Sequence, residues 1–180
     1  MRSRTFILSL FLLPALITIF SNADAAQKRN TSGTCNSEAK AAVWPKVRKF
    51  ESFSSSWKCD EKLLLTSFKV GNSRASLVRG HGEGICGATG NCPTWVVSRF
   101  AGRPKIILDA GSITDWYEFN YRKGRPYPDL ALRYRMGASD LIYRKYTFDG
   151  SNYRLASCFS ETYGTDGIRR LTRSHARLCS

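Results

Sequence analysis

The sequence predicts an α+β domain in which an N-terminal helix packs on an antiparallel β-sheet meander of about 7–8 strands, stapled by disulfides. One helical segment comes first, and a series of short apolar segments separated by turn residues follows it. Because these strands do not alternate with further helices, they favour antiparallel pairing over parallel βαβ units. The chain of 180 residues contains six cysteines, which can form these disulfides.

Residues 1–26 have the build of a secretory signal peptide. Arg2 and Arg4 precede an apolar run over residues 6–20, and Ala23-Asp24-Ala25 is a small-x-small cleavage site. The apolar run is too short for a membrane span. We therefore expect a secreted or periplasmic protein with no integral membrane segment after cleavage. It would retain about 155 residues, the size of one domain.

Residues 27–62 are predicted to be an N-terminal helical and linker segment. Ser37 is placed to be an N-cap, and residues 39–44 have helix-forming composition. Pro45 interrupts the helical pattern, and the serine-rich stretch 52–56 has the composition of a linker.

Residues 63–162 are predicted to form the antiparallel β domain. Leu130, Leu132 and Tyr134 alternate with polar or small residues, which is typical of a half-buried strand. Asp149-Gly150 is a hairpin signal between two such segments. The expected strands cover residues 63–70, 75–79, 94–100, 105–109, 116–121, 130–135, 141–148 and 153–159. Residues 163–180 are predicted to be a basic C-terminal tail, because the stretch 169–177 contains no acid.

The net charge of the chain is +14. Removal of the signal peptide leaves about +13. This excess indicates an anionic partner, which for an exported protein means an anionic polymer of the cell wall or an envelope protein. Nucleic acid is a disfavoured partner in vivo because the protein is expected outside the cytosol. In the alternative interpretation the charge only keeps an exported protein soluble.

The cysteines are read first as disulfides, because an exported chain folds where thiols oxidise. Cys86 and Cys92 flank a short glycine-bearing loop, so we expect them to pair. The other four have several possible pairings, of which the neighbours in sequence are Cys35 with Cys59 and Cys158 with Cys179. Their spacing does not match paired C-x-x-C zinc knuckles, and the chain has two histidines, so no metal and no cofactor are expected.

The strongest catalytic candidates are His81 and Glu83, which lie in the glycine-rich segment 80–84. A histidine and a carboxylate close together can serve as general base and acid. The competing interpretation is a surface turn with two solvated side chains, and it is favoured because no complete catalytic site is visible. G-x-S-x-G, H-E-x-x-H and Walker motifs are all absent from the sequence.

A binding candidate is the segment that interleaves cations with aromatic residues. Guanidinium groups bind phosphate or carboxylate as a fork, and tyrosine rings stack on sugars or bases. The competing interpretation is the ordinary solvated face of a sheet. The predicted binding residues are Tyr121, Arg122, Arg125, Tyr127, Arg133 and Arg135.

Two segments, CGATGNCPTWV at residues 86–96 and YTFDGSNY at residues 146–153, resemble a group of small, uncharacterised exported bacterial proteins. The likeness extends over residues 77–159. It implies a bacterial envelope location and a mostly β domain, and it brings no catalytic residues with it.

These observations favour a non-enzymatic, exported protein that binds an anionic envelope partner, either a cell-wall polymer or a protein. An inhibitor or immunity-like module is one form of this hypothesis. The alternative is a small secreted hydrolase that uses His81 and Glu83.

Overall fold

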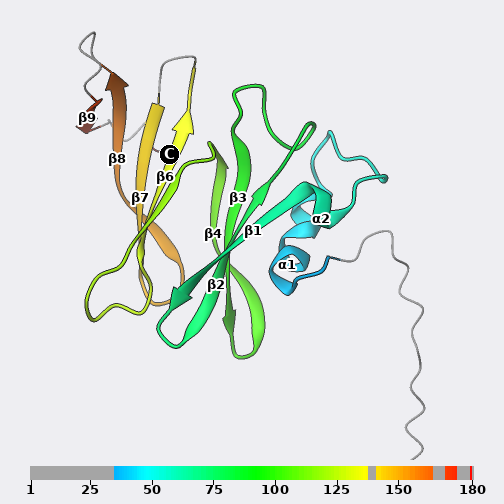
Figure 1. Ribbon diagram of the computed structural model, residues 1–180, viewed down its shortest axis with the longest axis horizontal. Helices are drawn as coiled ribbons and strands as arrows, with labels where there is room; N and C mark the ends of the chain where they lie inside the picture. The colour runs from blue at the N-terminus through cyan, green and yellow to red at the C-terminus, as the bar shows by residue number, and fades with distance from the viewer. Residues whose placement is uncertain (1–34, 138–140, 164–168, 174–178, 180) are drawn as a thin grey trace, which may run out of the picture.

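Nine antiparallel strands form two sheets (Figure 1), in a computed structural model that describes residues 35–137, 141–163, 169–173 and 179. The helices are α1 (Glu38–Val47) and α2 (Cys59–Lys62). The first sheet contains β1 (Leu63–Val70), β2 (Ser73–Gly80), β3 (Cys92–Phe100) and β4 (Arg103–Ile113). The second sheet contains β5 (Tyr117–Asn120), β6 (Asp129–Arg135), β7 (Leu141–Phe148), β8 (Tyr153–Tyr163) and β9 (Arg169–Arg173).

The structure confirms the antiparallel strands, the N-terminal helix and the disulfides, but the prediction of one continuous meander is wrong. The chain runs in order through each sheet and passes from the first to the second between β4 and β5. A single row of nine strands would leave one apolar face in water, whereas two stacked sheets bury both inner faces against each other. The helices form only a minor part of the fold.

The core between the two sheets follows strand alternation. Leu77 and Val96 of the first sheet belong to one apolar cluster with Leu130 and Leu132 of the second sheet. Tyr134 links the sheets, because its hydroxyl donates a hydrogen bond to the Ala110 carbonyl over 2.6 Å. Burial raises the pKa of the Tyr134 phenol above its ordinary value of 10.0, so the group remains a donor.

The opposite face of the first sheet carries a second apolar cluster, in which Val78 and Trp95 pack against Val43, Trp44 and Val47 of α1. Residues 92–98 of β3 are therefore buried without interruption, because the strand has a core on both faces. The molecule has three layers: α1, the first sheet and the second sheet (Figure 1).

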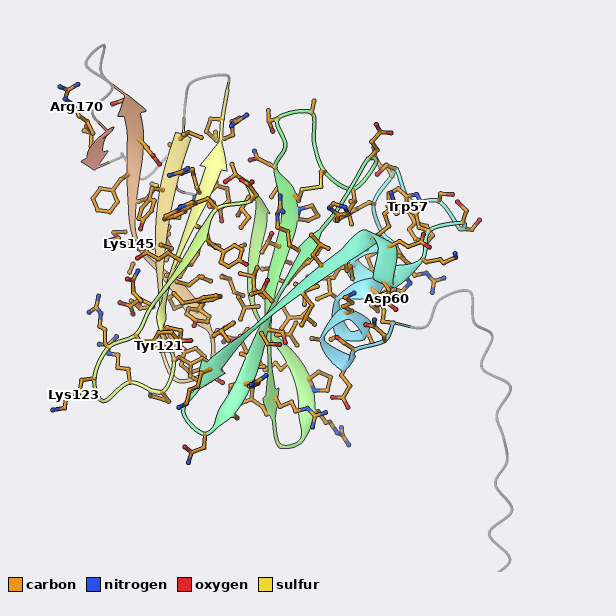
Figure 2. The ribbon with its side chains drawn as sticks, in the orientation of Figure 1. Trp57, Asp60, Tyr121, Lys123, Lys145 and Arg170 are labelled. Carbon is orange, nitrogen blue, oxygen red and sulfur yellow. A yellow bond between two sulfur atoms is a disulfide. The ribbon has the colours of Figure 1, made fainter. Side chains whose placement is uncertain are left out.

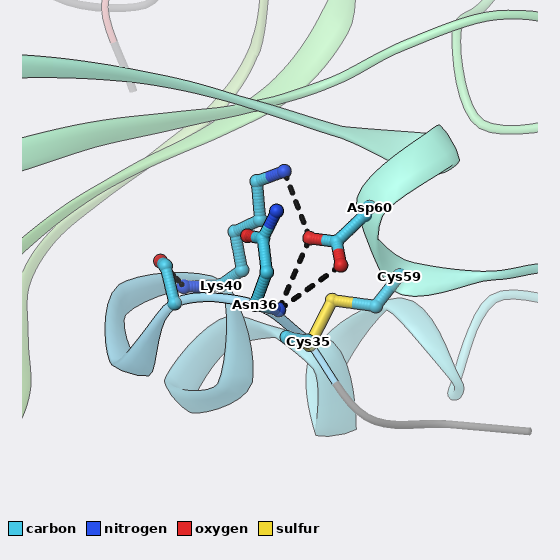
Figure 3. The surroundings of a disulfide bond; sticks show 6 residues. Cys35, Asn36, Lys40, Cys59 and Asp60 are labelled. Carbon is cyan, nitrogen blue, oxygen red and sulfur yellow. Dashed lines mark hydrogen bonds and ion pairs between the residues drawn. A yellow bond between two sulfur atoms is a disulfide. The ribbon is translucent and has the colours of Figure 1, made fainter. Parts of the chain in front are cut away.

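The start of α1 is fixed by local contacts. The Ser37 hydroxyl accepts a hydrogen bond from the Lys40 backbone N–H, which confirms the predicted N-cap. The disulfide between Cys35 and Cys59 joins the chain before α1 to α2 (Figure 3). Asp60 then accepts hydrogen bonds from the Asn36 N–H and from the Lys40 ammonium group, at 3.0 Å each.

The predicted disulfide between Cys86 and Cys92 is present. The other cysteines pair as neighbours in sequence, Cys35 with Cys59 and Cys158 with Cys179. Strand β9 lies within the segment 163–180 that was predicted to be a basic tail, so part of that segment joins the second sheet.

The predicted signal peptide, residues 1–26, lies outside the described residues. None of the helices in the described ranges has the length and apolarity that a membrane crossing requires.

Candidate anion-binding site

Four connections lie at one end of the sandwich, along the lower edge of Figure 1, and we call this region the turn end. They are the β1–β2 turn (residues 71–72), the β3–β4 turn (101–102), the β5–β6 loop (121–128) and the β7–β8 turn (149–152). An antiparallel meander places alternate connections at the same end, so this grouping follows from the strand order.

Direct contacts hold these connections together, two of them across the sheets and one within the second sheet. The Gly71 N–H donates a hydrogen bond to the Pro126 carbonyl over 3.0 Å. The Lys105 ammonium group donates to the Ser151 hydroxyl over 3.2 Å. The Tyr127 ring stacks on Phe148 with ring centroids 3.8 Å apart. The turn end is therefore one continuous surface rather than four separate hairpin tips.

Cations outnumber acids at the turn end by a wide margin. Of the acids in or beside it, Glu38, Asp129 and Asp149 pair with arginine, and Glu118 lies on β5 three residues before the β5–β6 loop. The cations are Lys69, Arg74, Arg99, Arg103, Lys105, Arg122, Lys123, Arg125 and Arg154. Such an excess creates a positive potential that attracts anions before any specific contact forms.

The predicted binding residues Arg122 and Arg125 already pair with an acid of the protein itself. Both guanidinium groups lie beside the Asp129 carboxylate, whose side chain is 9% exposed, and the Arg125 contact is 3.8 Å. By contrast, no acid lies within ion-pair distance of Lys69, Arg74, Arg103 or Lys123 in the part of the chain that the structure describes. These four side chains remain available to an external anion.

A groove lies beside the β1–β2 hairpin, on the part of the first sheet that α1 leaves uncovered. It consists of a depression of about 340 Å³ and an adjoining one of about 440 Å³. Ser67 and Arg74 line both depressions, and we call the feature the Arg74 groove. Ser67 and Ser76 are paired in register across β1 and β2, so both hydroxyl groups lie on this face with Arg74.

The chemistry of the Arg74 groove suits phosphate or carboxylate. A guanidinium group binds two oxygens of one such group as a fork, and serine hydroxyls donate further hydrogen bonds. Arg99 also lines the groove and pairs with Glu38 at the start of α1. Within the described ranges, no group of three or more His, Cys, Asp or Glu is placed to hold a metal ion.

The structure divides the six predicted binding residues between separate regions. Tyr121, which is 57% exposed, lies at the turn end, where its hydroxyl accepts a hydrogen bond from the Lys69 N–H (Figure 2). Tyr127 is half-buried between the sheets, and its hydroxyl contacts Ser98 over 2.8 Å. The β5–β6 loop carries Tyr121 and Tyr127 together with Arg122 and Arg125.

Arg133 and Arg135 lie on β6, away from the turn end. The Arg133 guanidinium lies 3.0 Å from the Glu161 carboxylate and 4.7 Å from the Trp116 ring centroid. Arg135 is exposed, and its backbone N–H and carbonyl bond to the Asn91 side chain. The predicted patch is therefore not one surface.

His81 and Glu83 lie in the connection between β2 and β3, and both are exposed. Lys62 holds the backbone of this loop: its carbonyl accepts from the His81 N–H, and its ammonium group donates to the Glu83 carbonyl over 2.8 Å. Gly84 lies against Trp57, where a Cβ atom would come within 2.6 Å of the ring. These contacts order the backbone, but they do not orient the two side chains toward each other.

Ser67, Arg74 and Ser76 were missed by the sequence analysis. They flank the Gly71-Asn72 turn, and their alternation places them on the same face of the hairpin. This pattern was visible in the sequence. Its meaning depends on α1, which covers the rest of that sheet face and leaves these residues in a groove.

No protein-family model, curated protein or solved structure matches the chain.

Proposed function

We propose that this protein is a non-enzymatic binding protein for an anionic, phosphate-bearing polymer of the bacterial envelope, and that the turn end is its binding surface. The observation that supports the proposal most directly is Arg74, an exposed arginine without an acidic partner in the described ranges that lines both depressions of the groove. Lys69, Arg103 and Lys123 extend the positive surface over three of the four connections.

A polymer fits this arrangement better than a small anion does. The available cations are spread over the β1–β2 turn, the β3–β4 turn and the β5–β6 loop. One small anion can contact one of these positions, whereas a chain of regularly spaced phosphates can contact several at once. Linked contacts raise the overall affinity because each one increases the effective concentration for the next.

An envelope location is part of the proposal. Three disulfides and the predicted signal peptide are compatible with an oxidising, extracytoplasmic compartment. Anionic wall polymers are abundant partners in that compartment.

The test is binding of the protein to polyglycerol phosphate, with uncharged dextran as the polymer control. For Lys69→Ala/Arg74→Ala we expect at least fivefold weaker binding at about 0.1 M salt. The slope of log affinity against log salt should fall by about two, because two phosphate contacts are lost. Arg48→Ala/Lys145→Ala removes one arginine and one lysine that lie outside the turn end, at the end of α1 and on the outer face of the second sheet. It is the matched control and should change affinity less than twofold (Figure 2).

Equal losses in the control and in the groove variants would show that only net charge matters. Unchanged binding in the double variant would rule out the Arg74 groove. Binding of an acidic protein in place of the polymer would assign the surface to a protein partner instead.

The hydrolase alternative gains no support from the positions of His81 and Glu83. Both side chains are exposed, and no hydrogen bond or ion pair joins them in the part of the chain that the structure describes. It predicts that some hydrolytic activity disappears in His81→Ala while the protein stays folded. Any activity that survives both His81→Ala and Glu83→Ala belongs to other residues.

A further inference from the structure

A second depression, of about 340 Å³, lies at the other end of α1, between the helix and strands β3 and β4. We call it the Trp95 cleft, and its main lining residues are Lys46, Lys49, Phe50, Pro93, Trp95 and Asp109. The Arg74 groove lies beside Ser37 and Glu38 at the start of α1, so the helix separates the two features. The volume falls within the range of sites for small organic ligands.

The cleft has an apolar, aromatic floor. The Phe50 and Trp95 rings are stacked with centroids 6.5 Å apart and an angle of 21° between their planes. Pro93 adds a third apolar surface. Such a floor favours a flat apolar ligand group, because the ligand and the aromatic rings both release water when they come into contact.

Trp95 supplies a second observation. The residue is 2% exposed, and its indole Nε1 is buried without a hydrogen-bond partner in the described ranges. Its indole N–H resonance therefore reports changes at the bottom of the cleft.

The rim of the cleft carries one unbalanced positive charge. Lys46 and Asp109 form an ion pair of 2.8 Å, and both are about half-exposed. Lys49 is exposed, and no acid lies within ion-pair distance of it in the described part of the chain. The cleft therefore combines an apolar floor with a single available ammonium group.

We propose that the Trp95 cleft binds a small amphipathic anion, with a flat apolar body against Phe50, Pro93 and Trp95 and one carboxylate or phosphate on Lys49. This site is separate from the polymer-binding surface, and the inference does not depend on the proposed function.

The experiment follows the backbone and indole N–H resonances of the ¹⁵N-labelled protein during titration with 2-naphthoate. The neutral analogue 2-naphthalenemethanol is the control ligand. We expect a saturable shift of the Trp95 indole resonance, with the Trp57 resonance unchanged. The carboxylate should bind at least fivefold more tightly than the alcohol, because only the carboxylate pairs with Lys49.

Lys49→Ala should remove this difference between the two ligands. Arg48→Ala, an exposed cation at the end of the same helix that does not line the cleft, should retain the difference. Lys69→Ala/Arg74→Ala should also retain it, so failure at this site is distinguishable from failure of the polymer proposal. Absence of a saturable Trp95 shift, or equal affinity for carboxylate and alcohol, would overturn the inference.

Discussion

The two sheets share one topology but cover their outer faces in different ways. The first sheet is covered by α1, which packs Val43, Trp44 and Val47 against it. On the outer face of the second sheet, Arg133 lies between Glu161 and the ring of Trp116. Glu161 is fully buried in this layer. One cover is therefore apolar, and the other depends on a charge pair.

This difference predicts different responses to mutation. An apolar cover loses stability in proportion to the volume removed, because each deleted group loses its own contacts. A buried ion pair responds as a unit, because removal of one member leaves the other charge without compensation. The second sheet should therefore be more sensitive to a single polar substitution.

The largest expected effect is that of Glu161→Ala. It leaves the Arg133 guanidinium, whose side chain is 20% exposed, without its carboxylate partner. We expect a loss of about 3–5 kcal/mol in the free energy of unfolding, measured by urea denaturation. On the first sheet, Asp109→Ala breaks the half-exposed Lys46–Asp109 pair and should cost only about 0–1 kcal/mol.

The double variant Arg133→Leu/Glu161→Leu is the control, because it removes both charges and keeps side-chain volume. Its stability should exceed that of Glu161→Ala. Equal losses for Glu161→Ala and Asp109→Ala would mean that the two outer faces are not energetically different.

The disulfides give the next largest effect. Cys35–Cys59 joins the chain before α1 to α2, which leads directly into β1, with a sequence separation of 24. Cys158–Cys179 acts on the second sheet with a separation of 21. Loop entropy alone predicts a loss of about 3 kcal/mol for removal of either bridge by paired Cys→Ser substitutions. A larger loss for Cys35→Ser/Cys59→Ser in thermal unfolding would show that this bridge also positions α1.

Cys86–Cys92 serves as the reference because its separation is only 6. The same relation predicts a loss of about 2 kcal/mol for this bridge. If removal of this bridge lowers the stability more than removal of either of the others, loop entropy is not the main source of the stability that the disulfides provide.

The smallest expected effect concerns pH and separates two turns of the turn end. In the β7–β8 turn, the Asp149 carboxylate accepts hydrogen bonds from the Asn152 and Ser151 N–H groups, at 2.8 and 2.9 Å, and pairs with Arg154. These contacts, the Asn152 bond first, hold the pKa of Asp149 well below its ordinary value of 3.8. Residues 101–102 of the β3–β4 turn have no carboxylate.

Because the folded-state pKa is depressed, the stability that Asp149 adds to the folded protein is present above about pH 4. This stability is lost as the pH falls through the folded-state pKa. An NMR titration should show the Asp149 carboxyl group still ionised at about pH 3, where an ordinary aspartic acid is mostly protonated. The amide chemical shifts of residues 151–152 should change with this titration, and this change should be absent in Asp149→Asn. The amide chemical shifts of residues 101–102 should not change. Titration of Asp149 at its ordinary pKa would contradict the hydrogen-bonded turn.

Much of the fold was predictable because it depends on short-range chemistry. Strand β1 was expected at residues 63–70 and lies there, and Ser37 caps α1 as expected. The Cys86–Cys92 bridge follows from a short glycine-bearing loop. Strand β4 was expected to end at Asp109 but continues to Ile113, because it pairs with β3 as far as Cys92.

The candidate site was less predictable. Arg122 and Arg125 were recognised as cations, but the sequence pattern did not reveal that Asp129 pairs with both. Arg74 was not singled out, because its position in a groove depends on where α1 crosses the first sheet.

Residue patterns along the chain were sufficient for the strands, the helix cap and the shortest disulfide, since each depends on neighbours within a few positions. Three features could be recognised only in the folded structure. They are the division into two stacked sheets, the pairing of Arg133 with Glu161 and the grouping of cations at the turn end. Each of these features joins residues far apart in sequence. Such contacts depend on burial of both apolar sheet faces, which no local pattern specifies.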